Sequence, residues 1–267
     1  MSDRVHLTID DGIADVKLNR ADKRNALDNA MFQAVAEVGE QLKSESGLRA
    51  VVLSGDGKSF CAGLDMESMQ SIGNSKKDGS DSGPGEMAEG RITHLGQQIC
   101  WVWQELPVPV IAAVHGHALG GGLQIALGAD IRIVHPDTKM SVREVYWGLV
   151  PDMTGTFMLS RLTRPDIARE LTYTARIFSG TEAAELGLVT RLSETPHDDA
   201  MALAREIADK SPGAVRGAKS LFNALDHGGA AEAFDAERRV IGEQIGSANQ
   251  VESVLASFEN RAPVFVD

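Results

Sequence analysis

The stretch PVPVIAAVHGHALGGGLQIAL, residues 107–127, constrains the fold of this chain more than any other. It begins with a largely apolar run that is typical of a buried strand. Three consecutive glycines at 120–122 then open a second apolar segment with a helical pattern. The first N–H groups of such a helix are unpaired and can bind an anion or a developing oxyanion. The alternative is that a tight strand-to-helix turn needs small residues for packing.

The glycine spacing excludes two common phosphate-binding motifs. A dinucleotide fingerprint needs G-x-G-x-x-G, and a P-loop needs Gly-Lys-Ser/Thr after its glycines, and neither is present here. A second loop of small residues, SFCAGLDM at 59–66, also follows a buried strand. If both loops lie at the same edge of a parallel sheet, each can direct one N–H at a single carbonyl oxygen. The two loops together predict an oxyanion hole.

Hydrophobic periodicity predicts an α/β fold. VHLTIDDGIADVKLN alternates apolar and polar residues around Asp11-Gly12, which indicates a β-hairpin. From Leu27 to Leu42, apolar residues recur every three or four positions, as in a helix that Asp28 caps. Strands are expected in RAVVLSG at 49–55 and DIRIVHP at 130–136, and a helix is expected near 87–105. This alternation favours parallel strands with crossover helices.

The chain is predicted to comprise an α/β core at 1–195 and a mostly helical region at 196–267. Residues 73–86, GNSKKDGSDSGPGE, contain almost nothing apolar and are expected to form a mobile loop. A length of 267 residues suits one large domain, or a main domain with a small appendage.

Composition excludes several function classes. The formal net charge of −12 argues against general nucleic-acid binding. Two cysteines are too few for a disulfide scaffold. His115 and His117 form an H-x-H pair without a third ligand nearby in sequence, so no metal site is expected. Neither a signal peptide nor an apolar run of about 18 residues is visible, so we expect no membrane span and a cytoplasmic location.

Three blocks, SFCAGLDM, PVPVIAAVHGHALGGGLQIALGADIRI and SVREVYWGLVPDMTGT, resemble in order and spacing the crotonase superfamily, the enoyl-CoA hydratase/isomerase group. RADKRNAL at 20–27 and FSGTEAAELGLVTRL at 178–192 fit the same pattern. The resemblance implies a crotonase-like ββα spiral core of the α/β class with a C-terminal helical region. It also implies assembly through that region into a homotrimer or a dimer of trimers.

The resemblance further implies an acyl-CoA thioester as substrate, in fatty-acid β-oxidation. Coenzyme A would enter as part of the substrate, so no separate cofactor is expected, and neither a nucleic acid nor a membrane is expected as a partner. By motif, the oxyanion hole falls on the backbone amides of Leu64 and Gly121, which would stabilise an enolate. Loss of one such donor typically costs about 3–4 kcal/mol.

Coenzyme A would lie across KRNAL and FCAGL, at Arg24, Ala26, Ala62 and Leu64. Arg24 would then lie near the phosphates. The alternative for this arginine is plain solvated surface.

Hydratases of the superfamily use two glutamates. The second matches Glu144, whereas the first falls on Gln124. An amide has no titratable proton near neutral pH, so Gln124 can orient water or substrate but cannot act as general acid or base. Glu144 is therefore the expected proton-transfer residue. Its alternative role is a surface carboxylate paired with Arg143.

Asp152 follows Glu144 by eight residues, as in the dienoyl-CoA isomerases of the superfamily, where hydratases usually carry glycine. Those isomerases also carry an acid at the place of Gln124, so the match is incomplete. Asp152 could instead cap the helix that begins after Met153. With Glu144 and Asp152 as catalytic residues, we expect Δ3–Δ2-enoyl or dienoyl-CoA isomerisation rather than hydration.

Two other functions remain open. The chain could be an enoyl-CoA hydratase proper, in which Glu144 activates water while another group protonates C2. It could also be a catalytically weak acyl-CoA-binding protein, because Gln124 replaces an acid.

Overall fold

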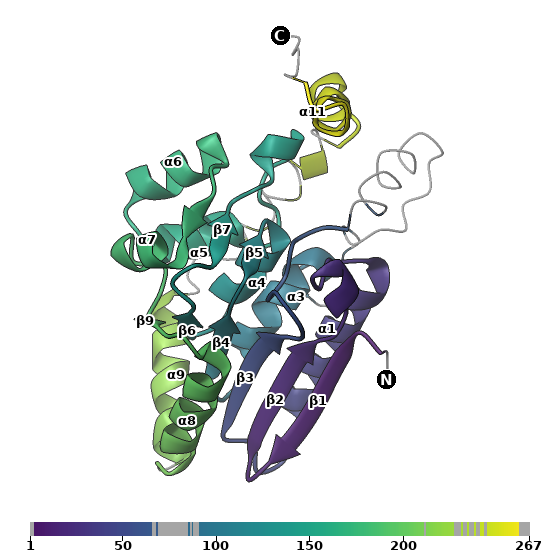
Figure 1. Ribbon diagram of the computed structural model, residues 1–267. Coiled ribbons are helices and arrows are strands. Elements are labelled where there is room, and N and C mark those ends of the chain that lie inside the picture. Colours follow the sequence, from purple (N-terminus) through teal and green to yellow (C-terminus); the bar gives the residue numbers. More distant parts are fainter. Residues whose placement is uncertain are drawn as a thin grey trace.

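The computed structural model describes residues 3–65, 91–210, 212–226 and 245–261, with single positions at 68, 85, 87, 231, 234, 238, 241 and 242. Within this part, six strands form one sheet in the order β1-β2-β3-β4-β6-β9 (Figure 1). They are β1 Val5–Asp10, β2 Ile13–Leu18, β3 Ala50–Gly55, β4 Val110–Val114, β6 Ile131–Val134 and β9 Arg191–Leu192.

The predicted hairpin and parallel strands are confirmed. Strands β1 and β2 are antiparallel, and their turn residues Asp11 and Gly12 both have left-handed backbones, with φ 48° and 76°. This conformation matches the twist of a two-residue hairpin. Every later pair in the sheet is parallel, with Leu53 of β3 between Val16 of β2 and Ala112 of β4.

Helices cover both faces of this sheet. On one face lie α1 (Asn29–Lys43) and α3 (Leu95–Glu105), which pack against each other. On the other face, Ala200 and Ala204 of α8 (Pro196–Ala208) contact a second apolar cluster that includes Val52 and Ile111. The parallel strands are therefore apolar on both faces, as layered α/β proteins require.

Side-chain caps set where the two core helices begin. Asp28 accepts a hydrogen bond from Met31 N at 2.8 Å, so the predicted cap of α1 is confirmed. The expected helix near 87–105 begins only at Leu95. His94 caps it there, because its ring accepts from Gln97 N while the Gln97 side chain accepts from His94 N, both at 3.2 Å. Such reciprocal bonds satisfy N–H groups that a helix start leaves unpaired.

A small second sheet holds the segments that matter for function. Its strands β5 (His117–Leu119), β7 (Lys139–Ser141) and β8 (Phe178–Ser179) lie in the order β5-β7-β8. Strand β5 leads through the glycines into α4 (Gly121–Leu127), and β7 ends three residues before Glu144. Gly120 N also donates to Ser141 O at 2.9 Å. The glycine turn and Glu144 are thus positioned by paired strands.

The remaining elements lie mainly toward the C-terminus. They are η1 Ala21–Lys23, η2 Val145–Trp147, α5 Gly155–Leu162, α6 Pro165–Thr174, α7 Gly180–Glu185, α9 Pro212–Asp226 and α11 Ala248–Phe258. Helix α11 contacts η2 and lies apart from α8 and α9 (Figure 1). The boundary predicted between 195 and 196 falls where α8 begins, and the division into two regions stays a prediction.

Parts of the sequence prediction fall on residues that are not described. The expected loop at 73–86 lies outside the described residues except for position 85, and so does most of 230–245. Among the described helices, none combines the length and the apolar character that crossing a bilayer needs.

The α1–α3 contact generates a stability prediction. A Cβ on Gly39 would lie 2.6 Å from Val102 Cγ1 and closer still to Cγ2. We expect Gly39→Ala to lower the free energy of unfolding by about 1–3 kcal/mol through overpacking, although alanine is the better helix former. Urea unfolding measures the change.

Gly217→Ala in α9 is the matched control, because nothing lies within 4 Å of its added Cβ. It should stabilise the protein by about 0.5–1 kcal/mol. Adding Val102→Ala to Gly39→Ala should recover part of the loss. Equal stability of Gly39→Ala and Gly217→Ala would show that the helices do not restrict position 39.

Candidate active site

The glycines that open α4 allow side chains from other segments to approach the backbone. Gly120 has a left-handed φ of 51°, and a Cβ there would lie 3.1 Å from Glu144 Oε1. A Cβ on Gly121 would lie 2.9 Å from both Leu27 Cδ1 and Met153 Sδ. The packing explanation for the glycines is therefore correct, and it also brings Glu144 to the start of the helix.

The second loop presents the Leu64 amide through a short parallel bridge between Leu64 and Leu27. Leu27 N donates to Gly63 O at 2.8 Å, and Asp65 N donates to Leu27 O at 3.0 Å. Successive N–H groups of an extended segment point in alternate directions. Since the groups on both sides of Leu64 face Leu27, the Leu64 N–H points away from it.

The two loops are in direct contact. Gly63 has a φ of 90°, and a Cβ on it would lie 2.6 Å from Leu119 O and 3.9 Å from Gly121 N. Within the described part of the chain, neither Leu64 N nor Gly121 N donates a hydrogen bond. Two neighbouring N–H donors without protein acceptors are the groups that a developing oxyanion requires.

Glu144 and Gln124 meet inside the protein. Both are buried, with exposed fractions of 9% and 2%, and Gln124 Nε2 donates to Glu144 Oε1 at 2.6 Å. Gln124 Oε1 accepts from Met153 N at 3.0 Å and from Gly155 N at 2.8 Å. These two backbone donors identify which end of the amide is oxygen, so its NH2 group must face Glu144.

The structure shows further contacts for Gln124 and for the neighbour of Glu144, Arg143. Sequence reasoning assigned Gln124 to substrate orientation, whereas its polar atoms contact Glu144 and the start of α5. The alternative of a surface pair between Glu144 and Arg143 is not what the structure shows. The Arg143 guanidinium donates to Ala175 O at 3.0 Å and stacks on the Tyr146 ring, with Cζ 3.7 Å from its centroid.

Asp152 lies half-buried in the segment that leads into α5. Helix α5 begins at Gly155, three residues after Asp152, and the capping role considered for Asp152 stays a prediction. Its neighbour Met153 donates to Gln124, which ties the Asp152 segment to the buried pair. Sequence reasoning missed Gly155, where a Cβ would lie 2.5 Å from Gln124 Oε1. A glycine in the first turn of a helix was the sequence signal that could have indicated this close contact.

The two segments predicted to bind coenzyme A lie side by side, because Ala62 N donates to Arg24 O at 2.9 Å. Arg24 is exposed, Ala26 is buried, and Ala62 and Leu64 are partly buried.

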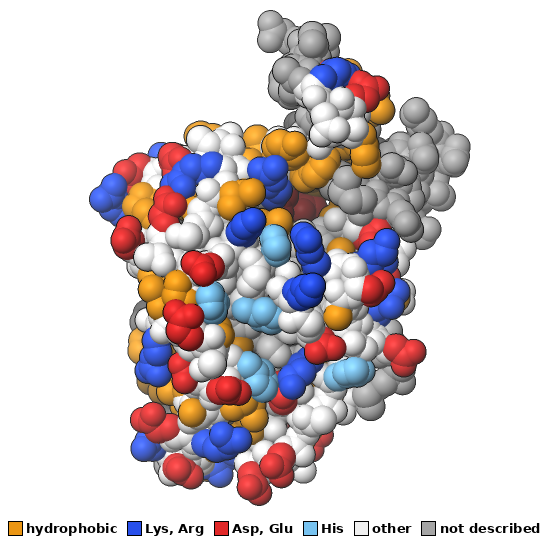
Figure 2. All heavy atoms as spheres, viewed as in Figure 1, with side chains coloured by type: hydrophobic (Ala, Val, Ile, Leu, Met, Phe, Trp, Pro, Cys, Tyr) orange, Lys and Arg blue, Asp and Glu red, His pale blue; other side chains and the backbone are white. Residues whose placement is uncertain are grey.

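Positively charged side chains lie near His117, which follows β4. Lysine, arginine and histidine gather near the centre of the face in Figure 2. His117 Nδ1 lies 2.9 Å from Ser59 Oγ, and burial together with the charges of Arg24 and Lys139 lowers the pKa of His117. His115 Nε2 lies 3.0 Å from Gly57 O, so both histidines contact the 57–59 loop. In the described part, no three His, Cys, Asp or Glu side chains converge as a metal site would need.

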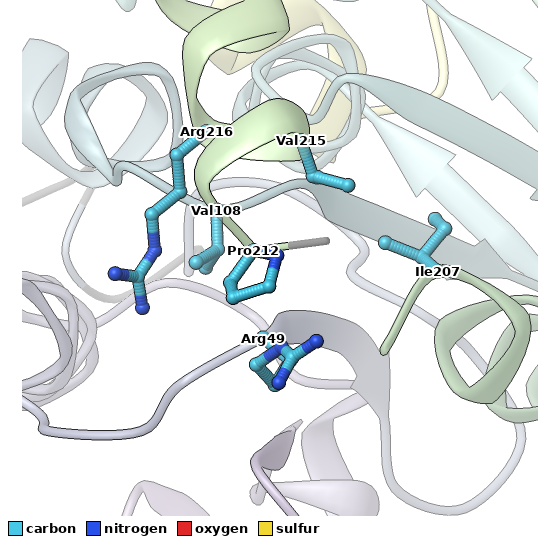
Figure 3. Close-up of a pocket in the computed structure, with 6 residues that line it drawn as sticks. All are labelled: Arg49, Val108, Ile207, Pro212, Val215 and Arg216. Atoms are coloured by element: carbon cyan, nitrogen blue, oxygen red, sulfur yellow. The ribbon is translucent and has the colours of Figure 1, made fainter. Parts of the chain in front are cut away.

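A separate hollow lies at the junction of α8 and α9 (Figure 3). It is lined by Arg49, Val108, Ile207, Pro212, Val215 and Arg216. Arg49 donates to Ala208 O and Lys210 O, and Arg216 donates to Leu48 O. Both guanidinium groups therefore hold backbone carbonyls, which is a structural role.

Comparison with known proteins shows the family of this chain. A sequence model of the enoyl-CoA hydratase/isomerase family matches residues 8–267. The chain belongs to this family. It is 36% identical over 254 residues to human mitochondrial Delta(3,5)-Delta(2,4)-dienoyl-CoA isomerase, covering 92% of this chain and 76% of the relative. It is 34% identical over 265 residues to mouse mitochondrial enoyl-CoA hydratase domain-containing protein 2, covering 96% and 84%.

A solved structure from this family confirms the fold. The enoyl-CoA hydratase/isomerase from Pseudoalteromonas atlantica superimposes with a TM-score of 0.85 at 26% identity, covering 98% of this chain and all of the other. The expected crotonase-like α/β core is thus confirmed. Both hydratases and isomerases occur among the relatives, so membership alone does not decide the reaction.

The charges around His117 generate a titration prediction. Because positive charges help to hold the pKa of His117 below its ordinary 6.5, Arg24→Gln should raise it. In the parent protein, the pKa of His117 is lower in the folded than in the unfolded chain, so the unfolded chain binds more protons below about pH 6.5. The stability of the parent protein is therefore lost as the pH falls into this window. Arg24→Gln should lessen that loss.

The ring signals of His117 in NMR spectra measure this pKa. Lys43→Gln is the control, because Lys43 pairs with Glu40 and Glu105. It should leave the pKa of His117 unchanged. An unchanged pKa in Arg24→Gln would show that the Arg24 charge does not act on His117.

Proposed function

We propose that this protein isomerises double bonds of acyl-CoA thioesters, using Leu64 N and Gly121 N as the oxyanion hole and Glu144 as the proton-transfer group. One observation carries the preference for isomerisation. The polar group that contacts Glu144 Oε1 at 2.6 Å is a carboxamide, which donates a hydrogen bond but has no proton to transfer.

A single carboxylate is sufficient for Δ3–Δ2 isomerisation. With the thioester oxygen at the two N–H groups, Glu144 removes a proton from C2 of a 3-enoyl thioester. The electron pair spreads over the conjugated enolate, with negative charge on the thioester oxygen. The protonated Glu144 then returns the same proton to C4, which leaves the Δ2 double bond. Stabilising the enolate charge lowers the barrier of both steps.

Asp152 extends this chemistry to a dienoyl substrate. Conversion of a 3,5-dienoyl to a 2,4-dienoyl thioester moves a proton from C2 to C6, which are too far apart for one small carboxyl group to reach easily. One carboxylate can remove the first proton while a second delivers the other. Asp152 is held near the pair through the bond from Met153 to Gln124. The 36% identity to a dienoyl-CoA isomerase supports this extension.

Hydration is the second candidate, favoured by relatives whose names include enoyl-CoA hydratase. Glu144 would activate water, and a different group would have to protonate C2. Gln124 cannot supply that proton. The oxyanion hole serves both reactions, so turnover measurements must separate them.

We also propose that subunits associate as a homotrimer or a dimer of trimers. Exposed apolar side chains on α9 and α11 support an association surface, including Leu221 at 72% and Phe222 at 67% exposure, and Leu255 and Phe258.

A substrate panel tests the proposed reaction. The parent protein should convert 3-enoyl- and 3,5-dienoyl-CoA faster than it hydrates 2-enoyl-CoA, as followed by absorbance. Glu144→Gln should lose turnover by about 10²–10⁴-fold because the proton acceptor is gone, while CoA-ester binding persists. Asp152→Asn should lose dienoyl turnover and keep 3-enoyl turnover.

Normal turnover by Glu144→Gln would show that another residue is the base. Absence of turnover on all three thioesters, with CoA-ester binding retained, would instead support a binding protein.

Gln124→Glu should shift the reaction toward hydration. The new carboxyl group would lie close to Glu144, and two carboxylates at such a distance share a proton, which provides a general acid. We expect the ratio of hydration to isomerisation to rise at least about tenfold, as a general acid contributes about 10²–10⁴-fold to rate. Gln124→Met, which cannot donate to Glu144, is the control and should lose both reactions. An unchanged ratio in Gln124→Glu would show that position 124 does not select the reaction.

A further inference from the structure

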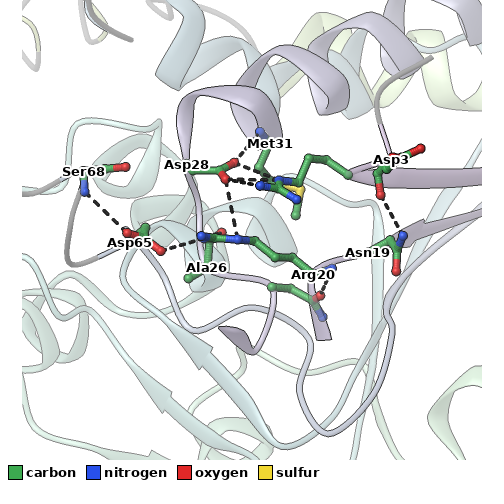
Figure 4. Close-up of polar contacts among 10 residues, drawn as sticks. Asp3, Asn19, Arg20, Ala26, Asp28, Met31, Asp65 and Ser68 are labelled. Carbon is green, nitrogen blue, oxygen red and sulfur yellow. Dashed lines mark hydrogen bonds and ion pairs between the residues drawn. The ribbon is translucent and has the colours of Figure 1, made fainter. Parts of the chain in front are cut away.

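Arg20 lies between two carboxylates from different segments (Figure 4). Its NH1 atom is 2.6 Å from Asp65 Oδ2, and its Nε atom is 3.5 Å from Asp28 Oδ2. NH1 also donates to Ala26 O at 3.1 Å. The three charged side chains are mostly buried, with exposed fractions of 12%, 7% and 19% for Arg20, Asp65 and Asp28. Water therefore screens these contacts less than it screens surface ion pairs.

The two carboxylates flank the bridge that presents the Leu64 amide. Asp28 directly follows Leu27, and Asp65 directly follows Leu64, while Leu27 and Leu64 are the bridged residues. Arg20 thus connects the two bridged segments through Asp28 and Asp65, each of which lies one residue after the bridge. Asp65 N also donates to Leu27 O, so the residue that Arg20 holds is one that fixes the direction of the Leu64 N–H.

One end of this connection is anchored independently of Arg20. Asp28 caps α1 through Met31 N at 2.8 Å and accepts from Arg4 NH2 at 2.7 Å. Asp65 belongs to the loop, where its carboxylate accepts from Arg20 NH1 at 2.6 Å and from Ser68 N at 3.4 Å. The start of α1 is therefore coupled to the loop through the Arg20 guanidinium group in addition to the Leu27–Leu64 bridge.

We propose that Arg20 is a positioning residue that holds the Leu64 N–H in place for the thioester oxygen. This inference rests on the proposed function. Without Arg20, the buried Asp65 carboxylate would lose this ion pair, and the segment would rotate to bring the carboxylate toward water. An oxyanion donor acts only when it is preorganised at the right distance. A shift of about 1 Å in such a group can reduce the rate about 100-fold.

Vibrational spectroscopy of a bound, carbonyl-labelled acyl-CoA tests the idea. Donors of an oxyanion hole polarise the thioester C=O group and lower its stretching frequency. In Arg20→Met, the frequency should return part of the way to that of the free thioester. The kcat for 3-enoyl-CoA should fall by about 10–100-fold, with KM changed less than about twofold, because Arg20 itself is not among the residues expected to contact coenzyme A.

Two variants separate positioning from a general loss of charge. Arg20→Lys should recover part of both effects, because an ammonium group can still pair with Asp65 but cannot span all three acceptors. Arg4→Met is the matched control, because it removes a cation from Asp28 while Arg20 remains. It should leave the carbonyl frequency and kcat close to the parent values.

Circular dichroism and thermal unfolding establish that each variant folds. If Arg20→Met does not fold, Asp65→Asn replaces it and should reproduce the frequency change and the loss of kcat. Parent-like frequency and kcat in a folded Arg20→Met or Asp65→Asn would overturn the positioning role. Equal losses in Arg4→Met would also overturn it, because the effect would then arise from the α1 cap. A parent protein that does not shift the carbonyl frequency would refute the oxyanion hole itself, so the two failures are distinguishable.

Discussion

The short bridge between Leu27 and Leu64 is the contact on which the site depends. Its two backbone hydrogen bonds use the groups on both sides of Leu64 and leave the Leu64 N–H directed away from Leu27. The first turn of α4 then supplies Gly121 N beside it. Neither of these N–H donors needs a particular side chain, so the proposed oxyanion hole depends on backbone geometry. Small residues are required only where the segments touch, as at Gly63 and Gly121.

The sequence predicted the parts of the fold that repeat with a regular period. The hairpin at Asp11-Gly12, the α1 stripe from Leu27 to Leu42 and the apolar runs of β3 and β4 each extend over enough residues to show a pattern. The β5-β7-β8 sheet was not predicted, because strands of two or three residues are too short for alternation to be visible. This sheet nevertheless positions Glu144 beside the glycines.

The candidate site was predicted as a set of residues but not as a network. Glycine spacing and motif resemblance indicated Gly121, Gln124 and Glu144. The contacts of Gln124 could not be foreseen, because its oxygen is bound by backbone N–H groups about thirty residues away in sequence. Backbone donors carry no residue-type signal. The pairing of Arg20 with Asp65 is hidden for a different reason, because both residue types usually lie on the surface.

The short distance between the side chains of residues 124 and 144 explains why an amide suits position 124. A second carboxylate 2.6 Å from Glu144 would have to share a proton with it, because like charges that close cannot both ionise. An amide fits the same position without sharing a proton, since its oxygen accepts from Met153 N and Gly155 N while its NH2 group donates to Glu144. Glu144 can then act as a single base whose orientation is fixed. A fixed single base suits a proton that leaves and returns on one acyl chain, whereas addition of water needs a second acid.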